Sequence, residues 1–402
     1  MTRRTAFFLL AVAATAASFC GRRPAAPPLN VVVILIDDLG WTDTGAYGST
    51  FYETPAIDRL AREGARFTRF YTASPVCSPT RASLMTGKYP ARVGITDWIG
   101  GDQKGRLLPA PYLDALPLDE VTVGEAFEAA GYVTGYAGKW HLGADLHMPV
   151  DQGFAETFAV NHAGQPSTYF APYHRATPSP MDVPDLEHDQ PGEYLTDRLT
   201  DAAVDFLTRH RDDKYFYVLS HYSVHTPLEA PEATIEKYRQ KHGGPPDVSE
   251  DAFEPEGPSF TKLHQDQPTY AAMIEATDHS VARVLEALDA TGVADHTLVV
   301  FLSDNGGLST LLRRGPNTPT SNAPLRAGKG WLYEGGIRAP LIVRWPGVVR
   351  PGLVVDGPAI TTDLYPTLLD AAGLPPKPDQ HVDGLSLAAA LRGDRPLPAR
   401  TL

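Results

Sequence analysis

A run of six apolar residues from Val31 to Ile36 constrains the fold of this chain more than any other segment. Most of these residues are β-branched, and no polar residues alternate with them. This pattern is typical of a strand that is buried on both faces of a sheet. The segments 215–219, 297–302 and 341–343 have the same character. Together these runs predict a sheet that is covered on both sides.

Segments with helical patterns separate the predicted strands. Helices are expected to begin near Thr54 and Thr122, where residue types typical of an N-cap precede the apolar pattern. Because strands alternate with helices along the chain, the sequence predicts an α/β fold with a mostly parallel central sheet sandwiched between helices. The predicted helices cover residues 54–64, 122–131, 193–211, 274–288 and 364–372.

Two stretches without such patterns, 165–192 and 243–267, are predicted to be long loops. Loops of this length in a compact protein often bind a ligand or move. The second stretch is acidic and rich in proline, and for it an insertion without a role is an equally good interpretation.

The chain carries an excess of negative charge. Its 402 residues include 35 Lys and Arg against 48 Asp and Glu, for a formal net charge of −13. No basic run and no basic patch with interleaved aromatic residues offsets this charge, so the sequence argues against nucleic-acid binding. An anionic small ligand is still compatible with it, since a few converging cations can hold such a ligand locally.

The N-terminal segment has the pattern of an export signal. Arg3 and Arg4 precede an apolar run over residues 6–19, which is too short for a comfortable membrane span. Residues 1–20 are therefore predicted to be a signal peptide, with cleavage near Ala17.

Cys20, at the end of this segment, leaves a second interpretation open. It lies where a lipoprotein signal has its lipidated cysteine, and residues 21–29, rich in Arg, Pro and Ala, have the composition of a short tether. No later segment is long and apolar enough to span a membrane. We expect an exported protein that is periplasmic, an outer-membrane lipoprotein or secreted, with contact to a membrane only through a lipid anchor at Cys20.

Polar residues follow two of the predicted strands at the point where each strand ends. Asp37 and Asp38 come directly after the first strand, and Asp304 and Asn305 come after the strand at 297–302. Ligands of open α/β sheets bind beyond the carboxyl ends of the strands. A single acidic pair more often caps a turn, but two pairs at equivalent strand ends favour a site for Ca²⁺ or Mg²⁺.

Cys77 is the only cysteine besides Cys20, so removal of the signal peptide would leave it without a partner for an internal disulfide. A free cysteine is often just a small buried residue. Here the neighbouring Pro79 and Arg81 and the exported setting call for a chemical explanation of the thiol.

Lysines and histidines follow other predicted strands. Lys139 and His141 are two positions apart, so an extended backbone would point both side chains the same way. A cation beside an imidazole suits an anionic substrate and proton transfer. His225 follows the strand at 215–219, where a single histidine is more often structural. Lys329 lies between two glycines, whose small size would let the backbone approach a ligand closely.

These residues together resemble a type I sulfatase of the alkaline-phosphatase-like superfamily. Cys77, Pro79 and Arg81 match the Cys-x-Pro-x-Arg signature that directs oxidation of the cysteine to Cα-formylglycine, and the segment 131–143 matches the second sulfatase signature. The resemblance extends over residues 30–394, with the motifs in the order of the family, which leaves little room for chance.

The resemblance implies one Ca²⁺ ion and a nucleophile derived from Cys77. Arg81 would hold and polarise the formylglycine, whose hydrate would attack sulfur. His225, with Lys329 near it, would protonate the leaving alcohol, and His141 would accept a proton as sulfate is expelled. The implied metal ligands are Asp37, Asp38, Cys77, Asp304 and Asn305, and the implied sulfate-binding residues are Lys139, His141, His225 and Lys329.

The implied activity is hydrolysis of a sulfate ester of an alcohol or a sugar, after maturation by a formylglycine-generating enzyme. Segments 96–99 and 325–332 are similar to bacterial enzymes that desulfate polysaccharides, and galactose or N-acetylgalactosamine 4-sulfates are the expected substrates. Two alternatives remain open. One is a phosphoester or phosphonate hydrolase of the same superfamily, and the other is a truncated, non-catalytic relative that binds glycans.

The resemblance also implies a smaller C-terminal subdomain, an antiparallel sheet with a helix packed on it. Residues 30–395 are predicted to form the catalytic domain, and residues 396–402 only the start of this subdomain. We therefore expect the subdomain to be largely missing, although it would normally cover apolar surface and close one side of the cleft.

Overall fold

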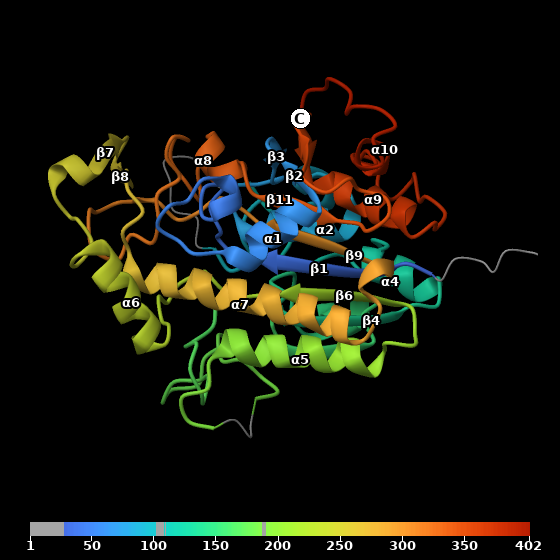
Figure 1. Ribbon diagram of the computed structural model, residues 1–402, viewed down its shortest axis with the longest axis horizontal. Coiled ribbons are helices and arrows are strands. Elements are labelled where there is room, and N and C mark those ends of the chain that lie inside the picture. Colours follow the sequence, from blue (N-terminus) through green and yellow to red (C-terminus); the bar gives the residue numbers. More distant parts are fainter. Residues whose placement is uncertain (1–27, 102–107, 109, 187–189) are drawn as a thin grey trace, which may run out of the picture.

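The computed structural model describes residues 28–101, 108, 110–186 and 190–402. Its centre is an eight-stranded sheet (Figure 1). One strand runs antiparallel to both of its neighbours, and all other neighbouring strands are parallel, as the sequence predicts. In order across the sheet the strands are β12 (Leu353–Val355), β2 (Ala65–Phe67), the antiparallel β11 (Leu341–Arg344), β9 (Thr297–Ser303), β1 (Asn30–Ile36), β6 (Tyr215–Ser220), β4 (Val133–Lys139) and β5 (Glu156–Asn161).

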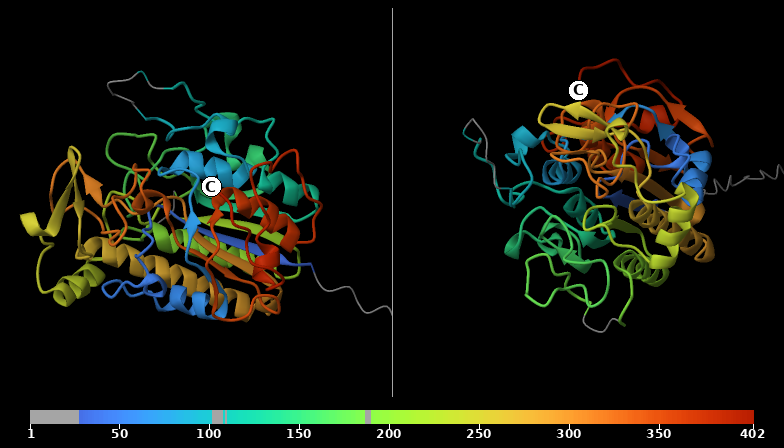
Figure 2. Two further views of the ribbon diagram at one scale, coloured as in Figure 1. Left: turned by 90° about the horizontal axis from the view of Figure 1, so that it is seen from above. Right: turned by 90° about the vertical axis from the view of Figure 1, so that its left-hand side faces the viewer.

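Both faces of the sheet are buried under helices. Successive residues of β1 point to opposite faces, so Val32 and Ile34 pack into one hydrophobic cluster while Val31 and Val33 pack into the other. This explains the absence of polar residues from the run. The two groups of helices lie on opposite sides of the strands in Figure 2. They are α1 (Pro55–Glu63), α5 (Leu195–Arg209) and α7 (Pro268–Ala290) on one face, and α2 (Cys77–Thr86), α4 (Val123–Ala129), α9 (Leu364–Ala371) and α10 (Ala388–Leu391) on the other.

The two predicted N-caps have different outcomes. At α4 the capping box is present, because the Thr122 hydroxyl accepts from the Glu125 N–H at 3.1 Å and the Glu125 carboxylate accepts from the Thr122 N–H at 2.7 Å. At α1 the Thr54 hydroxyl makes no cap hydrogen bond. The carboxylate of Asp278, from α7, instead accepts from the N–H groups of Ala56 and Ile57. The N-terminus of α1 is therefore capped by a residue that is distant in sequence, and not by the preceding threonine.

The two predicted loops also differ. Within the part of 165–192 that the structure describes there is no helix or strand. The stretch 243–267 is not a plain loop, since it contains the hairpin β7 (Phe253–Glu256) and β8 (Ser259–Lys262), which also pairs with β10 (Thr310–Leu311). Four-residue strands around Gly257 and Pro258 are too short and too polar for their alternation to be recognised in the sequence.

Several further elements complete the described part of the chain. They are α3 (Pro90–Val93), α6 (Glu232–His242), α8 (Glu334–Ile337) and the small pair of β3 (Phe70–Tyr71) with β13 (Ala359–Ile360). Among the described residues no helix has the length and apolar character needed to cross a bilayer. The predicted signal peptide, Cys20 and all but the last two residues of the tether lie outside the described residues.

The parallel strands all end at the same edge of the sheet. In Figure 1 the arrowhead of β1 points toward the end of the molecule that carries β7, β8 and α8. The opposite end holds the start of β1. At the C-terminus, residues 396–402 form no helix or strand, and Arg400 forms an ion pair with Asp363.

Candidate active site

The acidic residues predicted for the site meet at the carboxyl ends of β1 and β9, which are parallel neighbours. The backbone N–H of Asp38 donates to Asp304 Oδ1 at 3.2 Å, and Asn305 Nδ2 donates to Asp38 Oδ1 at 2.7 Å. Asp37 lies beside them, and all four side chains are buried. The structure therefore brings together the two polar pairs that the sequence placed at equivalent strand ends.

Two lysines compensate this buried negative charge. Lys139 Nζ lies 2.5 Å from Asp37 Oδ2, and Lys329 Nζ lies 2.7 Å from Asp38 Oδ1. Burial raises the pKa of Asp37 well above its usual range, with Lys139 opposing this and the charges of Asp304 and Asp38 adding to it. Burial acts on Asp38 in the same direction, but Lys329 and its other polar neighbours hold the pKa of Asp38 below its usual range.

The oxygen atoms at this edge fit a divalent cation. Asp37 Oδ1 and Asn305 Oδ1 are buried and accept no hydrogen bond from any described residue. Ligand atoms of Asp37, Asp38 and His225 all lie within 4.8 Å of one another. Carboxylate and amide oxygens are the ligands that Ca²⁺ prefers. Buried polar atoms are rarely left without a partner, so the two orphan oxygens favour a bound ion.

Cys77 begins helix α2 and is buried. Arg81 lies one helical turn later, so both side chains project from the same face of the helix. The Arg81 guanidinium is held in place by Asp304 Oδ2 at 2.8 Å, the Lys139 carbonyl at 2.7 Å and Ser220 Oγ at 2.8 Å. Its Nη2 is buried and has no partner among the described residues. Arg81 thus keeps one donor for a further ligand.

His141 contacts Cys77 directly, with Nδ1 at 3.2 Å from the sulfur. Its Nε2 lies 2.9 Å from the Ile99 carbonyl, which can only accept, so Nε2 carries the proton and Nδ1 presents a lone pair to Cys77. Burial, assisted by Lys139, lowers the pKa of His141 well below its usual value. His141 is therefore a neutral imidazole with its basic nitrogen aimed at residue 77.

The expected reason for the pairing of Lys139 with His141 is wrong. His141 has a φ of 59°, so the chain leaves the strand in a left-handed turn and is not extended at this point. Both side chains still reach the site, Lys139 at Asp37 and His141 at Cys77. The alternation of side chains along a strand therefore does not explain their convergence.

His225 faces the acidic cluster from the turn after β6. Its Nε2 is 3.7 Å from Asp38 Oδ2, and its Nδ1 is 2.9 Å from the Thr226 carbonyl, which fixes the proton on Nδ1. The hydroxyl of Tyr169 donates to the His225 carbonyl at 2.8 Å and supports the turn. Burial, followed by the charge of Lys329, lowers the pKa of His225 to about 3.

Lys329 reaches the site because two glycine-rich segments pack backbone against backbone. A Cβ on Gly306 would lie 1.9 Å from the Gly335 carbonyl oxygen, and one on Gly328 would lie 2.4 Å from the Gly307 oxygen. The glycines beside Lys329 were expected to allow close approach of a ligand. The close approach at Gly328 is instead to the segment that follows Asn305. We call this contact between residues 305–307 and 328–336 the glycine seam.

A side chain in the glycine seam should separate the two segments. Gly306→Ala is expected to lower the free energy of unfolding by about 1–3 kcal/mol and to reduce activity, because Asn305 and Lys329 would be displaced. Chemical denaturation and steady-state kinetics would measure both effects. The matched control is Gly315→Ala, where a Cβ would have no atom within 4 Å. Equal stability of the two variants would contradict the interpretation.

Sequence reasoning missed residues that hold the candidate site side chains. Ser220 Oγ and the Tyr136 hydroxyl both donate to the Lys139 carbonyl, at 2.7 and 2.6 Å. Ser220 directly follows the predicted strand 215–219, so the strand-end argument applied to Asp37 could have found it. His221, four residues before His225, has its Nε2 at 2.8 Å from Ser280 Oγ in α7 and is structural.

The fold and the site together define the class of protein. Buried carboxylates with lysines and histidines around them, at the carboxyl edge of an alkaline-phosphatase-like α/β sheet, are typical of hydrolases that act on anionic esters. A family model described as Sulfatase matches residues 29–374. The chain belongs to the sulfatase family and is an enzyme that hydrolyses sulfate esters.

Individual relatives agree with this assignment. The N-acetylgalactosamine-6-sulfatase of Mus musculus is 34% identical over 390 residues, which cover 92% of this chain and 68% of that protein. A protein named Sulfatase from Formosa agariphila is 34% identical and covers 90% of this chain and 72% of its own length. The solved structure of Ps i-CgsB in complex with k-i-k-neocarrahexaose has a TM-score of 0.74 at 30% identity, covering 92% of this chain and 77% of that one.

Proposed function

We propose that this sulfatase removes sulfate from a sugar of a sulfated polysaccharide or glycosaminoglycan, with a Cα-formylglycine made from Cys77 and one Ca²⁺ ion. The observation that carries the proposal is the position of Cys77. It is buried at the start of α2, 3.2 Å from the basic nitrogen of His141 and one turn before Arg81. A structural cysteine would not need a proton acceptor and a guanidinium beside it.

The cation would be held by oxygen ligands at the ends of β1 and β9. Bound there, it would supply positive charge to the sulfuryl oxygens and activate the hydroxyl of the hydrated aldehyde. The orphan oxygens of Asp37 and Asn305 support this assignment. The proposed ligands are Asp37, Asp38, Asp304, Asn305 and the modified residue 77.

The histidines have separate roles in proton transfer. His141 is neutral and its Nδ1 accepts, so it is placed to take a proton from a hydroxyl on residue 77. Arg81 fixes that residue through its free Nη2 donor. His225 carries its resident proton on Nδ1, bonded to a carbonyl, so its Nε2 must gain a proton before it can protonate a leaving alcohol.

The two lysines bind the sulfate. Lys139 is buried and Lys329 is mostly buried, and their ammonium groups lie within 3 Å of the neighbouring carboxylates of Asp37 and Asp38. Burial opposes the charge of Lys329, but the carboxylate of Asp38 raises its pKa above the usual value. An ammonium group that stays charged at this depth stabilises negative oxygens strongly, because little water screens it.

The pH dependence of turnover tests the role of His225. With its pKa at about 3, His225 is mostly neutral at working pH, and its protonated fraction falls about tenfold per pH unit. We expect kcat/KM to fall correspondingly as pH rises between about 5 and 8. A cation beside Asp38 would lower the pKa of His225 further, and kcat/KM would still fall as pH rises. His225→Gln is expected to show a lower and flat profile.

A flat pH profile in the mature enzyme with His225 in place would contradict this assignment. It would transfer the donor role to Lys329, whose ammonium group stays protonated throughout this range. Comparison of Lys329→Ala with His225→Gln at one pH would then show which side chain the leaving group needs.

The proposed sugar is a sulfated galactose or N-acetylgalactosamine. Two similar proteins support this class, since one is an N-acetylgalactosamine-6-sulfatase and the other was solved in complex with a neocarrahexaose. The proposal includes export by the segment 1–20 and maturation by a formylglycine-generating enzyme. Lipidation of Cys20 would attach the exported protein to a membrane.

One experiment addresses the proposal as a whole. The protein is coexpressed with a formylglycine-generating enzyme, residue 77 is identified by peptide mass spectrometry, and release of sulfate is measured on a panel of sulfated galactans and chondroitin sulfates. Aryl sulfate and aryl phosphate are assayed in parallel. An unmodified Cys77 in a fully active protein would contradict the nucleophile, and faster turnover of the phosphate would favour a phosphoester hydrolase.

A further inference from the structure

Two aromatic residues follow Lys329, a lysine of the proposed sulfate site, closely in the sequence. Trp331 is two residues after Lys329, so their Cα atoms are at most about 7 Å apart. Tyr333 follows, and its ring is nearly parallel to the Trp331 indole, with 14° between the planes and 6.3 Å between the centroids. This is the geometry of an offset-stacked pair.

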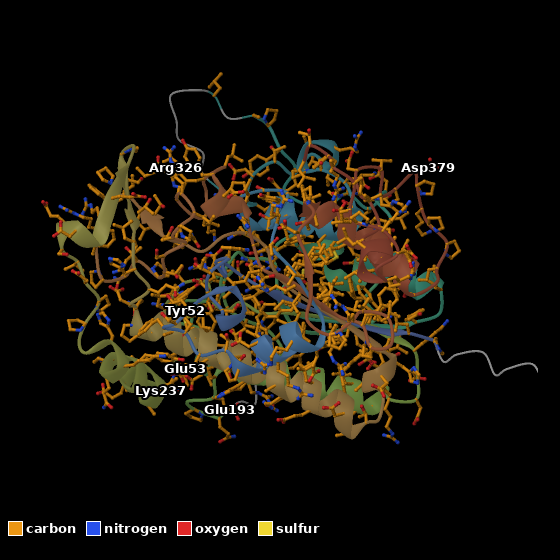
Figure 3. All side chains as sticks on the ribbon, turned by 45° about the horizontal axis from the view of Figure 1, so that its top comes forward. Tyr52, Glu53, Glu193, Lys237, Arg326 and Asp379 are labelled. Atoms are coloured by element: carbon orange, nitrogen blue, oxygen red, sulfur yellow. The ribbon has the colours of Figure 1, made fainter. Side chains whose placement is uncertain are left out.

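An arginine and a glutamate hold this pair in place. The Arg326 guanidinium lies 3.8 Å from the centre of the Tyr333 ring. Glu256, at the end of β7, accepts from Arg326 Nε at 2.7 Å and from its Nη2 at 2.8 Å. Such a bidentate pair fixes the plane of the guanidinium. Figure 3 shows Arg326 at the end of the molecule that carries the β7–β8 hairpin.

The arrangement is ordered but open to solvent. Tyr333 is 40% exposed and the Arg326 side chain is 56% exposed. Glu256, in contrast, is buried, so the pair is anchored on the side of the hairpin while Arg326 and Tyr333 remain accessible to solvent. Trp331 is partly exposed and four residues or fewer separate both rings from Lys329 along the chain, so the aromatic pair is accessible to a ligand held near that lysine.

We propose that Trp331, Tyr333 and Arg326 form a stacking platform for a pyranose ring of the sulfated saccharide. The inference rests on the proposed function, because it takes the substrate to be a saccharide. The C–H groups on one face of a pyranose are apolar, and an aromatic face removes them from water. Glu256 neutralises Arg326, so the platform suits an uncharged sugar face better than a second sulfate.

In this arrangement Glu256 is a positioning residue. It contacts neither sulfate nor cation, and acts by keeping Arg326 over the Tyr333 ring. The β7–β8 hairpin, in a stretch that the sequence left open as an insertion without a role, thereby contributes to recognition of the substrate.

Binding to protein with the substitution Cys77→Ala tests the platform without turnover. Isothermal titration calorimetry is done with a sulfated galactan hexasaccharide, a chondroitin sulfate hexasaccharide and inorganic sulfate. Adding Trp331→Ala is expected to weaken binding of a hexasaccharide about tenfold and to leave binding of inorganic sulfate unchanged. Trp331→Phe should restore most of the loss. The matched control is Leu332→Ala, at a neighbouring residue that is 80% exposed.

A second pair of variants tests Glu256. Glu256→Ala should weaken binding of the hexasaccharide and leave binding of inorganic sulfate unchanged. The temperature of unfolding should stay the same. Glu250→Ala is the control, since Glu250 pairs with Arg314 at 2.9 Å in the same stretch and Arg314 also lies over a ring, that of Phe260. Its loss should change neither affinity.

Three results would overturn the platform: unchanged hexasaccharide affinity in Trp331→Ala, an equal loss in Leu332→Ala, or failure of both hexasaccharides to bind. Binding of a hexasaccharide without turnover by the mature enzyme would instead contradict the proposed function and leave the platform supported.

Discussion

Replacement of Cys77 by alanine is expected to abolish sulfate-ester hydrolysis while the fold stays intact. The side chain is small and buried at the first position of α2, and alanine fits the same space. Loss of a nucleophile typically costs about 10⁴-fold or more in kcat. The rate on an aryl sulfate and the temperature of unfolding would be compared with those of the mature enzyme.

Cys77→Ser sharpens the same test. Serine keeps one hydroxyl at the position that His141 and Arg81 surround, but it lacks the second hydroxyl of an aldehyde hydrate. We expect a single sulfate transfer that stops at the serine ester, visible as a stable sulfated peptide by mass spectrometry. Multiple turnovers by either variant would show that residue 77 is not the nucleophile.

Removal of the cation is expected to have the second largest effect. Treatment with a chelator should lower kcat at least about 10²-fold, because the sulfuryl oxygens lose a nearby positive charge. Added Ca²⁺ should restore the rate. It should also stabilise the fold by about 2.7 kcal/mol when present at 100 times its dissociation constant, which thermal unfolding would detect.

Substitution of two carboxylates in the loop after β1 tests whether the response to Ca²⁺ needs a specific ligand or only negative charge nearby. Asp37→Asn is expected to remove the response to Ca²⁺, because the orphan oxygen of Asp37 is a proposed ligand. Asp43→Asn should keep it, since Asp43 is buried but already accepts from Tyr270 at 2.6 Å and Thr320 at 2.7 Å. Retention of the Ca²⁺ response in Asp37→Asn would place the ion elsewhere.

Much of the fold could be predicted because its signals are local and repeated. The run from Val31 to Ile36 is apolar on both sides of the strand, which only a doubly covered sheet explains. The polar pairs after β1 and β9 could be placed together for a related reason. Parallel strands end at one edge, so two strand ends that are distant in sequence become neighbours in space.

The rest depends on contacts that no local pattern encodes. The chain makes a left-handed turn at His141, just after the end of β4, in place of the extended geometry that the spacing suggested. The N-terminus of α1 is capped by Asp278, more than 200 positions away in sequence. The β7–β8 hairpin is short and polar, so its sequence resembles that of a loop.

The glycine seam has a consequence for how such an enzyme can change its substrate. Residues 305–307 and 328–336 meet with no side chain between Gly306 and Gly335, so these two glycines tolerate almost no substitution. Trp331 lies within the same segment, but it is partly exposed and its indole stacks on the exposed Tyr333. Laboratory evolution toward a new saccharide should therefore accumulate changes at Trp331 and along the β7–β8 hairpin. The glycines of the seam would remain unchanged, so the catalytic residues would keep their positions while the substrate specificity changes.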